Sequence, residues 1–186
     1  MGNFKNVKKG TKIGLFVFLA LSVAMFVSKI INLFARDGFP YAVWYDSAAL
    51  ILIAALMLYV FVLYKKPHGN LLRYLFFGFG VYMAAMGVLD FMRDLFVPAC
   101  FRLAATLIIT YVSGRLNKIE KNKPLLLVAG VFLLIYWCLY NFVYSAGQIS
   151  VRPLLGSLST IIYLGAFSFA YVARYEEHKA AGLEDK

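Results

Sequence analysis

The residues of this chain that are best suited to chemistry lie in the stretch DFMRDLFVPACFR, which runs from Asp90 to Arg102. It holds two carboxylates, Asp90 and Asp94, and two guanidinium groups, Arg93 and Arg102, between segments that are almost wholly apolar. Carboxylates beside guanidinium groups can form ion pairs, bind a polar solute or exchange protons with a substrate. The stretch is therefore either a charged loop in water or a polar site within a membrane.

Signatures of cofactor, metal and nucleotide chemistry are absent from the sequence. The only histidines, His68 and His178, have no partner at a metal-ligand spacing, and neither G-x-S-x-G nor H-E-x-x-H occurs. The glycines of GFGVYMAAMG, 78–87, are spaced almost like a dinucleotide fingerprint, but no strand precedes them. We interpret Cys100 and Cys138 as buried apolar thiols rather than as a disulfide. We therefore expect no metal and no cofactor, and the sequence favours a protein that is not an enzyme.

The composition places the charged stretch in a membrane protein. Of 186 residues, 62% are hydrophobic and only 15% are charged, whereas soluble domains average about 45–50% apolar and about 25% charged residues. The apolar residues fall in blocks close to the ~20 residues that a helix needs to cross a bilayer. Backbone groups in lipid must be hydrogen-bonded within their own segment, so these blocks are helices. We predict an all-α, polytopic membrane protein.

Six apolar blocks predict a six-transmembrane-helix bundle that forms a single transmembrane domain over residues 1–186. The predicted spans are 13–35, 41–64, 71–91, 95–113, 124–144 and 154–172. The third and fourth spans can also be read as one disturbed hairpin. Pro98 predicts a kink in the fourth span, because proline cannot donate a backbone hydrogen bond. The first block is long and has no small-x-small cleavage pattern, which favours a retained anchor over a cleaved leader.

The distribution of basic residues predicts the orientation in the membrane. Fourteen of the 19 Lys and Arg residues fall on the side of the two termini, and five fall on the other side. Cytoplasmic loops are the richer in Lys and Arg, so we place both termini in the cytoplasm of a multi-pass cell-membrane protein. The net charge of +10 is explained by this asymmetry and suits anionic lipid head groups. The lipid bilayer is thus the expected partner, and nucleic acid is not.

Depth along the helices places four polar residues in one layer. Asp90 lies 17 residues beyond Arg73, which corresponds to ~25 Å above the cytoplasmic interface. Lys29 and Asn141 reach a similar height, and Arg102 lies ~20 Å from that interface, below the outer surface of a core ~30 Å thick. Asp90 and Arg102 are expected to form an ion pair across their hairpin. Either this pair fixes the hairpin, with Lys29 reaching to the head groups, or the layer lines a binding site.

Aromatic residues with polar tips accompany this layer. Trp44 and Asp46 open the second span, while Trp137, Asn141 and Tyr144 share a face of the fifth. Tyrosine and tryptophan form belts at membrane interfaces, which explains the aromatics alone. An aromatic wall with a few convergent polar groups is also typical of a small-molecule pocket. The predicted ligand-binding residues are Asp90, Arg102, Asn141, Trp137, Tyr144, Lys29, Asp46 and Trp44.

Two helices carry small residues at helical spacing, which allow helix backbones to approach closely in lipid. The stripe on the first span is formed by Ala20, Ala24 and Ser28, and the stripe on the third by Gly80, Ala84 and Gly87. Such a stripe either packs within the chain or faces a partner membrane protein. The first span is the better candidate for a partner, because a terminal helix often lies at the edge of a bundle.

The resulting main hypothesis is a small membrane protein that binds a small solute in an outward-facing aromatic and polar pocket. It would act as a transporter or as the substrate-binding subunit of an uptake system. In size, six spans, internal termini and Ala20-x-x-x-Ala24, the layout resembles the substrate-binding subunits of energy-coupling-factor vitamin transporters. The chain departs from that family in lacking a clear glycine-rich turn after the second span.

Two other functions remain open from the sequence. The first is a non-transporting sensor, immunity or accessory protein that acts through helix–helix contact with a membrane partner. The second, a lesser alternative, is an intramembrane enzyme that uses Asp90, Asp94 or Asp46 with Arg102 on a lipid-linked substrate.

Overall fold

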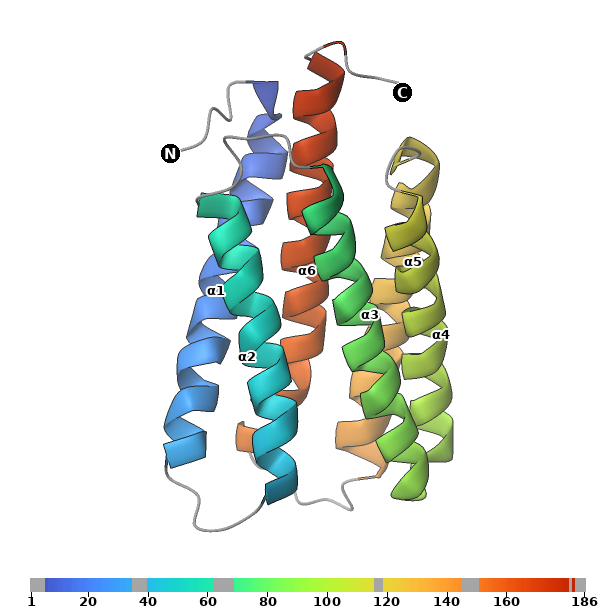
Figure 1. The fold of residues 1–186 in the computed structure, drawn as a ribbon. Coiled ribbons are helices and arrows are strands. Elements are labelled where there is room, and N and C mark those ends of the chain that lie inside the picture. The colour runs from blue at the N-terminus through green and yellow to red at the C-terminus, as the bar shows by residue number, and fades with distance from the viewer. Residues whose placement is uncertain are drawn as a thin grey trace. The chain divides into compact units, whose positions relative to one another are not determined.

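The computed structural model describes residues 6–34, 40–61, 69–115, 119–144, 151–180 and 182. Within them the chain forms six α-helices and one π-helical turn, η4, and no strand (Figure 1). The helices are α1 (Lys9–Phe34), α2 (Pro40–Phe61), α3 (Gly69–Met92), α4 (Phe96–Gly114), α5 (Ile119–Cys138) and α6 (Val151–Ala180), with η4 at Leu139–Val143. The predicted all-α class is confirmed.

Four of these segments are long and apolar enough to cross a membrane. They are Lys9–Ile31, Leu71–Met92, Phe96–Gly114 and Asn122–Val143. In α2 the described apolar part, Ser47–Val60, is shorter than a full crossing. Four helices are thus candidate membrane spans, while the number of six spans and the orientation of the termini stay predictions.

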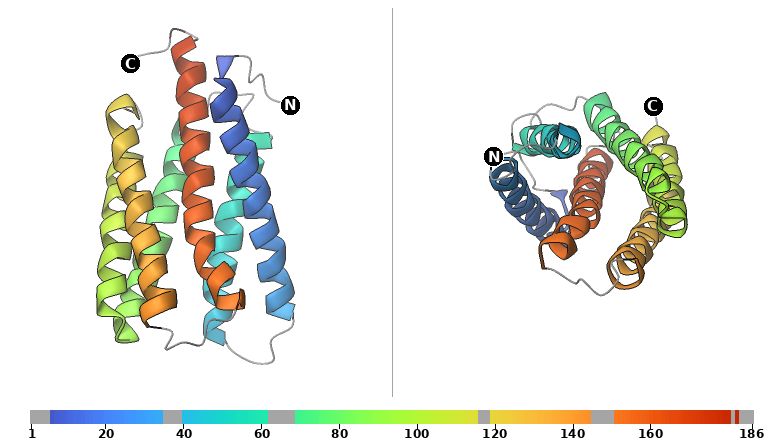
Figure 2. Two further views of the ribbon diagram at one scale, coloured as in Figure 1. Left: turned by 180° about the vertical axis from the view of Figure 1, so that it is seen from behind. Right: turned by 90° about the horizontal axis from the view of Figure 1, so that it is seen from below.

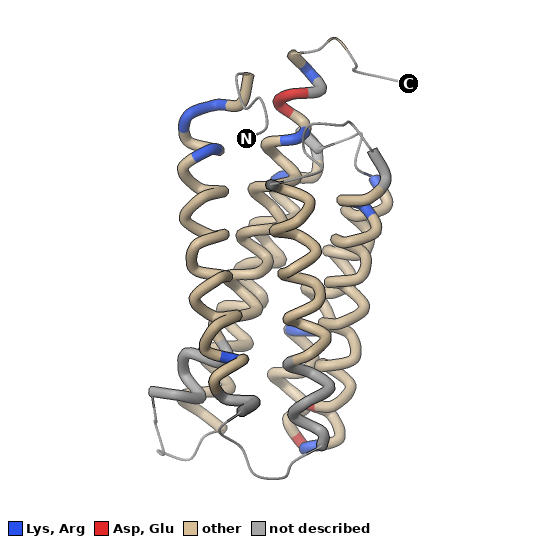
Figure 3. Tube along the Cα trace, turned by 60° about the vertical axis from the view of Figure 1, so that its left-hand side comes forward, with Lys and Arg blue, Asp and Glu red and all other residues tan. Residues whose placement is uncertain are grey.

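Charged residues concentrate toward the helix ends, and long uncharged stretches separate them (Figure 3). In α1, for example, no charged residue occurs between Lys12 and Lys29, and in α3 none occurs between Arg73 and Asp90. A charged side chain at the centre of a bilayer would cost ~2.5–3.5 kcal/mol. This distribution is what a membrane environment requires of the helices.

Pro98 does not interrupt α4, which corrects the predicted kink. The helix begins at Phe96, so Pro98 is its third residue. The first four N–H groups of any helix have no partner within the helix, and a missing donor there removes no hydrogen bond. The proline inside a helix is instead Pro124, in α5.

The chain divides into two compact units. The first comprises residues 1–75 and 165–186, and the second comprises residues 76–164. Helices α3 and α6 contribute to both units.

In the first unit, α1 and α6 each place a glycine against a phenylalanine ring of the other helix. Gly14 of α1 lies against the ring of Phe169, and Gly165 of α6 lies against the ring of Phe18. The two rings stack with centroids 5.4 Å apart. A Cβ atom at either glycine would collide with the opposing ring. The absence of that atom lets the two helices approach closely.

A polar cluster joins α1 and α6 at the end of the unit that holds the start of α1 and the end of α6 (Figure 1). The Glu176 carboxylate accepts hydrogen bonds from the Lys8 backbone N–H at 2.8 Å and from the Thr11 hydroxyl at 3.1 Å. Lys8 precedes the first residue of α1, where N–H groups lack intrahelical partners and negative charge is favourable. Glu176 therefore caps α1 from another helix.

Two further side chains extend this cluster. Arg174 donates a hydrogen bond from Nη1 to the Tyr59 hydroxyl at 3.2 Å, which links α6 to α2. Glu177 has a buried Oε1 atom without a hydrogen-bond partner among the described residues. Burial raises the pKa of Glu177, and the nearby charge of Lys12 partly opposes this effect. Adjacent glutamates of α6 thus differ in their hydrogen bonding, although both are half-buried.

In the second unit, α4 and α5 run side by side, as the two further views also show (Figure 2). Phe101 of α4 meets Phe132 of α5 edge to face, with ring centroids 5.9 Å apart. Cys100 and Cys138 of the same helices are free thiols, but both are exposed. The prediction that they are buried is therefore wrong, because both side chains lie on the surface of the chain.

The two small-residue stripes have different environments. Gly80 and Gly87 of α3 are buried against α4, where a Cβ atom would lie 2.8 Å from Thr110 Oγ1 and 2.7 Å from Leu103 Cδ2, respectively. This stripe packs within the chain. The stripe of α1 is exposed at all three of its positions, Ala20, Ala24 and Ser28.

Candidate functional site

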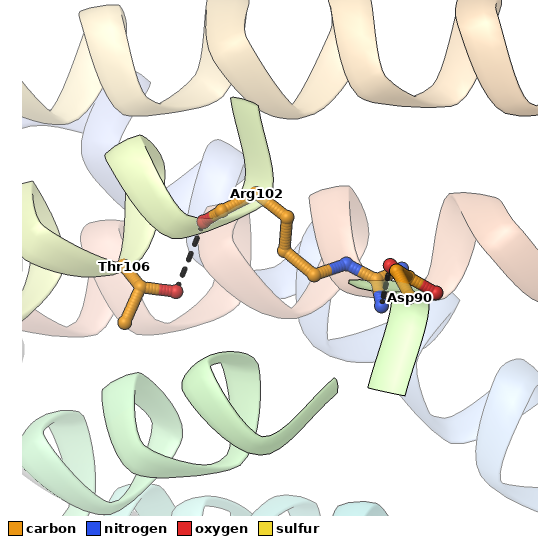
Figure 4. A network of polar contacts seen from close by, with 3 residues as sticks. All are labelled: Asp90, Arg102 and Thr106. Carbon is orange, nitrogen blue, oxygen red and sulfur yellow. Dashed lines mark hydrogen bonds and ion pairs between the residues drawn. The ribbon is translucent and has the colours of Figure 1, made fainter. Parts of the chain in front are cut away.

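The second unit contains a buried ion pair between Asp90 and Arg102 (Figure 4). Arg102 Nη1 lies 2.7 Å from Asp90 Oδ2. Only 2% of Asp90 and 4% of Arg102 is exposed. Asp90 is in the last turn of α3 and Arg102 is in the second turn of α4, so the pair joins the two arms of a hairpin. The predicted ion pair is confirmed.

The turn between α3 and α4 positions Asp90 through its backbone. The Asp90 carbonyl accepts the N–H groups of Arg93 at 3.1 Å and Leu95 at 3.0 Å, while Asp94 N–H bonds to the Phe91 carbonyl at 3.1 Å. These bonds form a Schellman motif, which requires a left-handed residue one position after the helix cap. Asp94 takes that conformation, with φ of 58°. The backbone therefore fixes the level at which the Asp90 side chain leaves α3.

The position of Arg102 depends on the close approach of α3 and α4. Gly87 lies one turn before Asp90, and a Cβ atom there would be 3.9 Å from Arg102 Cδ as well as close to Leu103. The missing side chain leaves room for Leu103 of α4, the neighbour of Arg102, beside α3. On α4, the Thr106 hydroxyl bonds to the Arg102 carbonyl at 3.0 Å (Figure 4).

Tyr136 of α5 completes the cluster and was not among the predicted site residues. Its ring centroid lies 3.9 Å from Arg102 Cζ, within the range of a cation–π contact. Its hydroxyl donates a hydrogen bond to the Asp90 carboxylate. Only 2% of Tyr136 is exposed. Asp90, Arg102 and Tyr136 thus contact one another in every pairing, and we call them the Asp–Arg–Tyr cluster.

A signal for Tyr136 was present in the sequence. The residue lies 12 positions after Pro124, which corresponds to ~18 Å along a helix. This depth is close to the ~20 Å that the rise per residue gives between Arg102 and Arg115. The choice among the aromatics at this level requires the rotation of α5 about its own axis. That helix is apolar on all sides, so no hydrophobic face indicates its rotation.

The hydrogen bonding of the cluster is incomplete within the described residues. Nη1 of Arg102 and Oδ2 of Asp90 are in ionic contact, but neither takes part in a hydrogen bond of good geometry. Arg102 Nε is buried and has no acceptor. Buried polar atoms without partners are rare in native proteins and each requires a physical explanation. The charges of Asp90 and Arg102 balance, so the pair itself carries no net charge.

The predicted residues of the fifth span lie around η4. Asn141 is buried and donates a hydrogen bond from its side-chain nitrogen to the Trp137 carbonyl at 2.8 Å. Trp137 meets Phe142 edge to face at 5.8 Å, and Tyr144 is 39% exposed. Tyr140 stacks on Tyr136 with centroids 5.8 Å apart. Aromatic side chains therefore continue from the cluster toward the end of α5. The π-helical turn η4 follows there, and such turns often mark functional sites.

The remaining predicted residues lie elsewhere in the chain. Lys29 is in α1, in the first unit. Trp44 and Asp46 belong to the first turns of α2, but their side chains lie outside the described part of the structure. The structure thus brings together Asp90 and Arg102 from the predicted set and adds Tyr136 to them.

Comparisons with known proteins identify no relative. No family model, curated protein or solved structure matches the chain. The features that indicate a function are the Asp–Arg–Tyr cluster and the surfaces of the helices. Among the residues that the structure describes, no three His, Cys, Asp or Glu side chains lie together as metal ligands.

Proposed function

We propose that the protein binds a small solute at the Asp–Arg–Tyr cluster, as a transporter or as the substrate-binding subunit of an uptake system in the cell membrane. The observation that carries the proposal concerns Arg102, which forms a buried ion pair with Asp90. Its Nε atom is a buried donor without an acceptor among the described residues. Ionisable residues within membrane helices usually face the protein interior and mark a substrate or ion pathway. A solute oxygen at Nε would complete the hydrogen bonding of the arginine.

The neighbouring side chains support this proposal. The half-buried ring of Tyr140 stacks on Tyr136, and Asn141 adds a buried amide just over one turn beyond Tyr136. Apolar walls with a few oriented polar groups are the common composition of small-molecule sites. The positive-inside distribution predicts that this end of the hairpin faces outward, which suits a site that captures solute from outside the cell.

The test is native mass spectrometry of the purified full chain after incubation with a protein-free metabolite extract. We expect a retained small molecule on the wild type that is lost in Arg102→Gln and weakened in Asn141→Ala. Ser113→Ala is the matched control, because Ser113 is a buried polar residue of α4 whose hydroxyl bonds to the Thr110 carbonyl at 2.7 Å. A wild type that retains no small molecule under these conditions would refute the proposal.

The exposed stripe of α1 favours a second candidate, an accessory protein that binds a membrane partner. Ala20, Ala24 and Ser28 lie on the surface, where small residues permit a close helix–helix approach. In this case Ala24→Leu would abolish co-purification of a partner membrane protein. Leu21→Ala, on the exposed surface of the same helix, would be the control with a smaller effect. Retention of the same partner by both variants would exclude the stripe as the interface.

A further inference from the structure

The contacts of Arg102 leave one edge of its guanidinium group for another acceptor. Nη1 faces Asp90, and Cζ lies over the Tyr136 ring. Nε is buried and has no acceptor among the described residues. In a planar guanidinium, the Nε–H bond and one N–H bond of Nη2 point in the same direction. An acceptor at Nε is thus placed for the two parallel hydrogen bonds that arginine forms with a carboxylate.

Asp90 has an oxygen atom whose hydrogen bonding is incomplete. Its Oδ2 atom is buried and accepts no hydrogen bond of good geometry from the described residues, although Arg102 Nη1 lies 2.7 Å away. A carboxylate oxygen has two acceptor positions and can bind a second donor. A donor that is itself charged would form the stronger bond. The cluster therefore lacks an acceptor at Arg102 Nε, and Oδ2 of Asp90 can take a second donor beside Arg102 Nη1.

Charge balance restricts the class of ligand. Asp90 and Arg102 neutralise each other at 2% and 4% exposure. A ligand with a carboxylate alone would leave one uncompensated negative charge in this buried place, and an amine alone would leave a positive one. Burial of an unpaired charge is strongly unfavourable. A ligand that carries both charges adds no net charge.

We propose that the cluster binds a zwitterionic solute of the α-amino acid class. Its carboxylate binds the Nε edge of Arg102, and its ammonium group binds Oδ2 of Asp90. The proposal rests on the proposed function, since it assigns a substrate class to the same site. The side chain of the solute is directed toward Tyr140, the half-buried ring that stacks on Tyr136.

The first experiment uses the wild-type full chain in lipid nanodiscs. Thermal-shift and calorimetric titrations are run with each of the standard α-amino acids at millimolar concentration, and the best binder is compared with its decarboxylated amine and its deaminated acid. We expect the amine and the acid to bind at least about tenfold more weakly than the zwitterion, because each lacks one charge-assisted contact. Equal affinity of the acid or the amine, or no binding by any amino acid, would overturn the proposal.

The second experiment uses Arg102→Lys, which keeps a positive charge beside Asp90 but removes the Nε edge. We expect this variant to keep the thermal stability of the wild type within a few degrees and to bind the best amino acid at least about tenfold more weakly. Ser113→Ala should bind it like the wild type. Unchanged affinity in Arg102→Lys would contradict the proposed contact.

The two proposals fail in distinguishable ways. If native mass spectrometry of the wild type shows a retained solute that is not zwitterionic, solute binding stands and the amino-acid class is wrong. If neither extract nor any amino acid leaves a bound molecule, both proposals are wrong, and a buried water is then the acceptor for Arg102 Nε.

Discussion

Arg102 Cζ lies over the Tyr136 ring, 3.9 Å from its centroid, while the hydroxyl of the same tyrosine bonds to Asp90. One aromatic side chain therefore contacts both members of a buried ion pair. Two substitutions of Tyr136 can therefore distinguish the ring contact with Arg102 from the hydrogen bond to Asp90. Phenylalanine keeps the ring beneath the guanidinium, whereas leucine removes both the ring and the hydroxyl.

We predict that Tyr136→Phe lowers the free energy of unfolding by about 1.5–3 kcal/mol, the usual effect of losing a hydrogen bond to a charged group. Tyr136→Leu should lower it by about 1 kcal/mol more, because the cation–π contact is also lost. Denaturant titration of the purified protein in detergent measures both values. Tyr140→Phe, one turn away, is the control. Equal effects of Phe and Leu at position 136 would show that the ring contact contributes nothing.

The ion pair itself is tested by exchanging its charges. Asp90→Arg and Arg102→Asp each leave two like charges in a buried place and should prevent accumulation of folded protein in the membrane, since breaking a buried pair costs about 3–5 kcal/mol. The double variant restores opposite charges and should recover part of the expression. Size-exclusion profiles of a fluorescent fusion provide the measurement. Without any recovery in the double variant, direct pairing would not explain the single effects.

The hairpin and its ion pair were predictable from the sequence, because both follow from distance along two neighbouring helices. Asp90 and Arg102 lie on either side of a short turn, and the rise per residue places them at similar depth. The contact with Tyr136 was not predictable in the same way. It depends on the rotation of α5, which has no polar face to indicate which side is inside.

The same limit explains the cysteines and the two stripes. In lipid, surface and interior are both apolar, so hydrophobicity does not separate buried Leu133 from exposed Leu134 or exposed Cys138. Small-residue spacing likewise occurs on α1 and α3, yet only the α3 stripe is buried. The environment depends on which helix lies alongside, and the spacing within one helix contains no information about its neighbour.

The left-handed backbone of Asp94 predicts a stabilising substitution. Aspartate at φ of 58° has a steric cost of about 1 kcal/mol that glycine avoids. Asp94→Gly should therefore raise the free energy of unfolding by up to about 1 kcal/mol, measured by denaturant titration. Arg93→Gly, at the neighbouring position with negative φ, should bring no gain. A loss of stability in Asp94→Gly would mean that the carboxylate contributes more than the strain removes.

Gly87 tests the close approach of α3 and α4. A Cβ atom there would lie 2.7 Å from Leu103 Cδ2, so Gly87→Ala should destabilise the protein by about 1–3 kcal/mol through overpacking. Leu103→Ala in the same background should recover part of this loss. Gly130→Ala is the matched control, because Gly130 of α5 has nothing within 4 Å of its Cβ position, and alanine there should stabilise the helix by about 0.5–1 kcal/mol. No difference between the two alanine variants would contradict the packing.

Glu176 and Glu177 are adjacent but should respond oppositely to the same change. Glu176→Gln removes the negative charge that caps α1 and should lower stability by about 1 kcal/mol at pH 7. Glu177 has a raised pKa because of burial, so its folded state favours the protonated form. Its contribution to stability is complete below the ordinary glutamate pKa of about 4.3 and is lost as the pH rises through the raised value. Glu177→Gln should therefore stabilise the protein at pH 7.

The increase for Glu177→Gln is at most about 1 kcal/mol, because water reaches part of this carboxyl group and screens it. The difference from the wild type should shrink as the pH is lowered toward 4, where the wild-type carboxyl is protonated as well. Thermal unfolding in detergent between pH 4 and pH 8 measures both variants. A Glu177→Gln protein that is less stable than the wild type at pH 7 would show that the attraction to Lys12 outweighs the burial of the carboxylate.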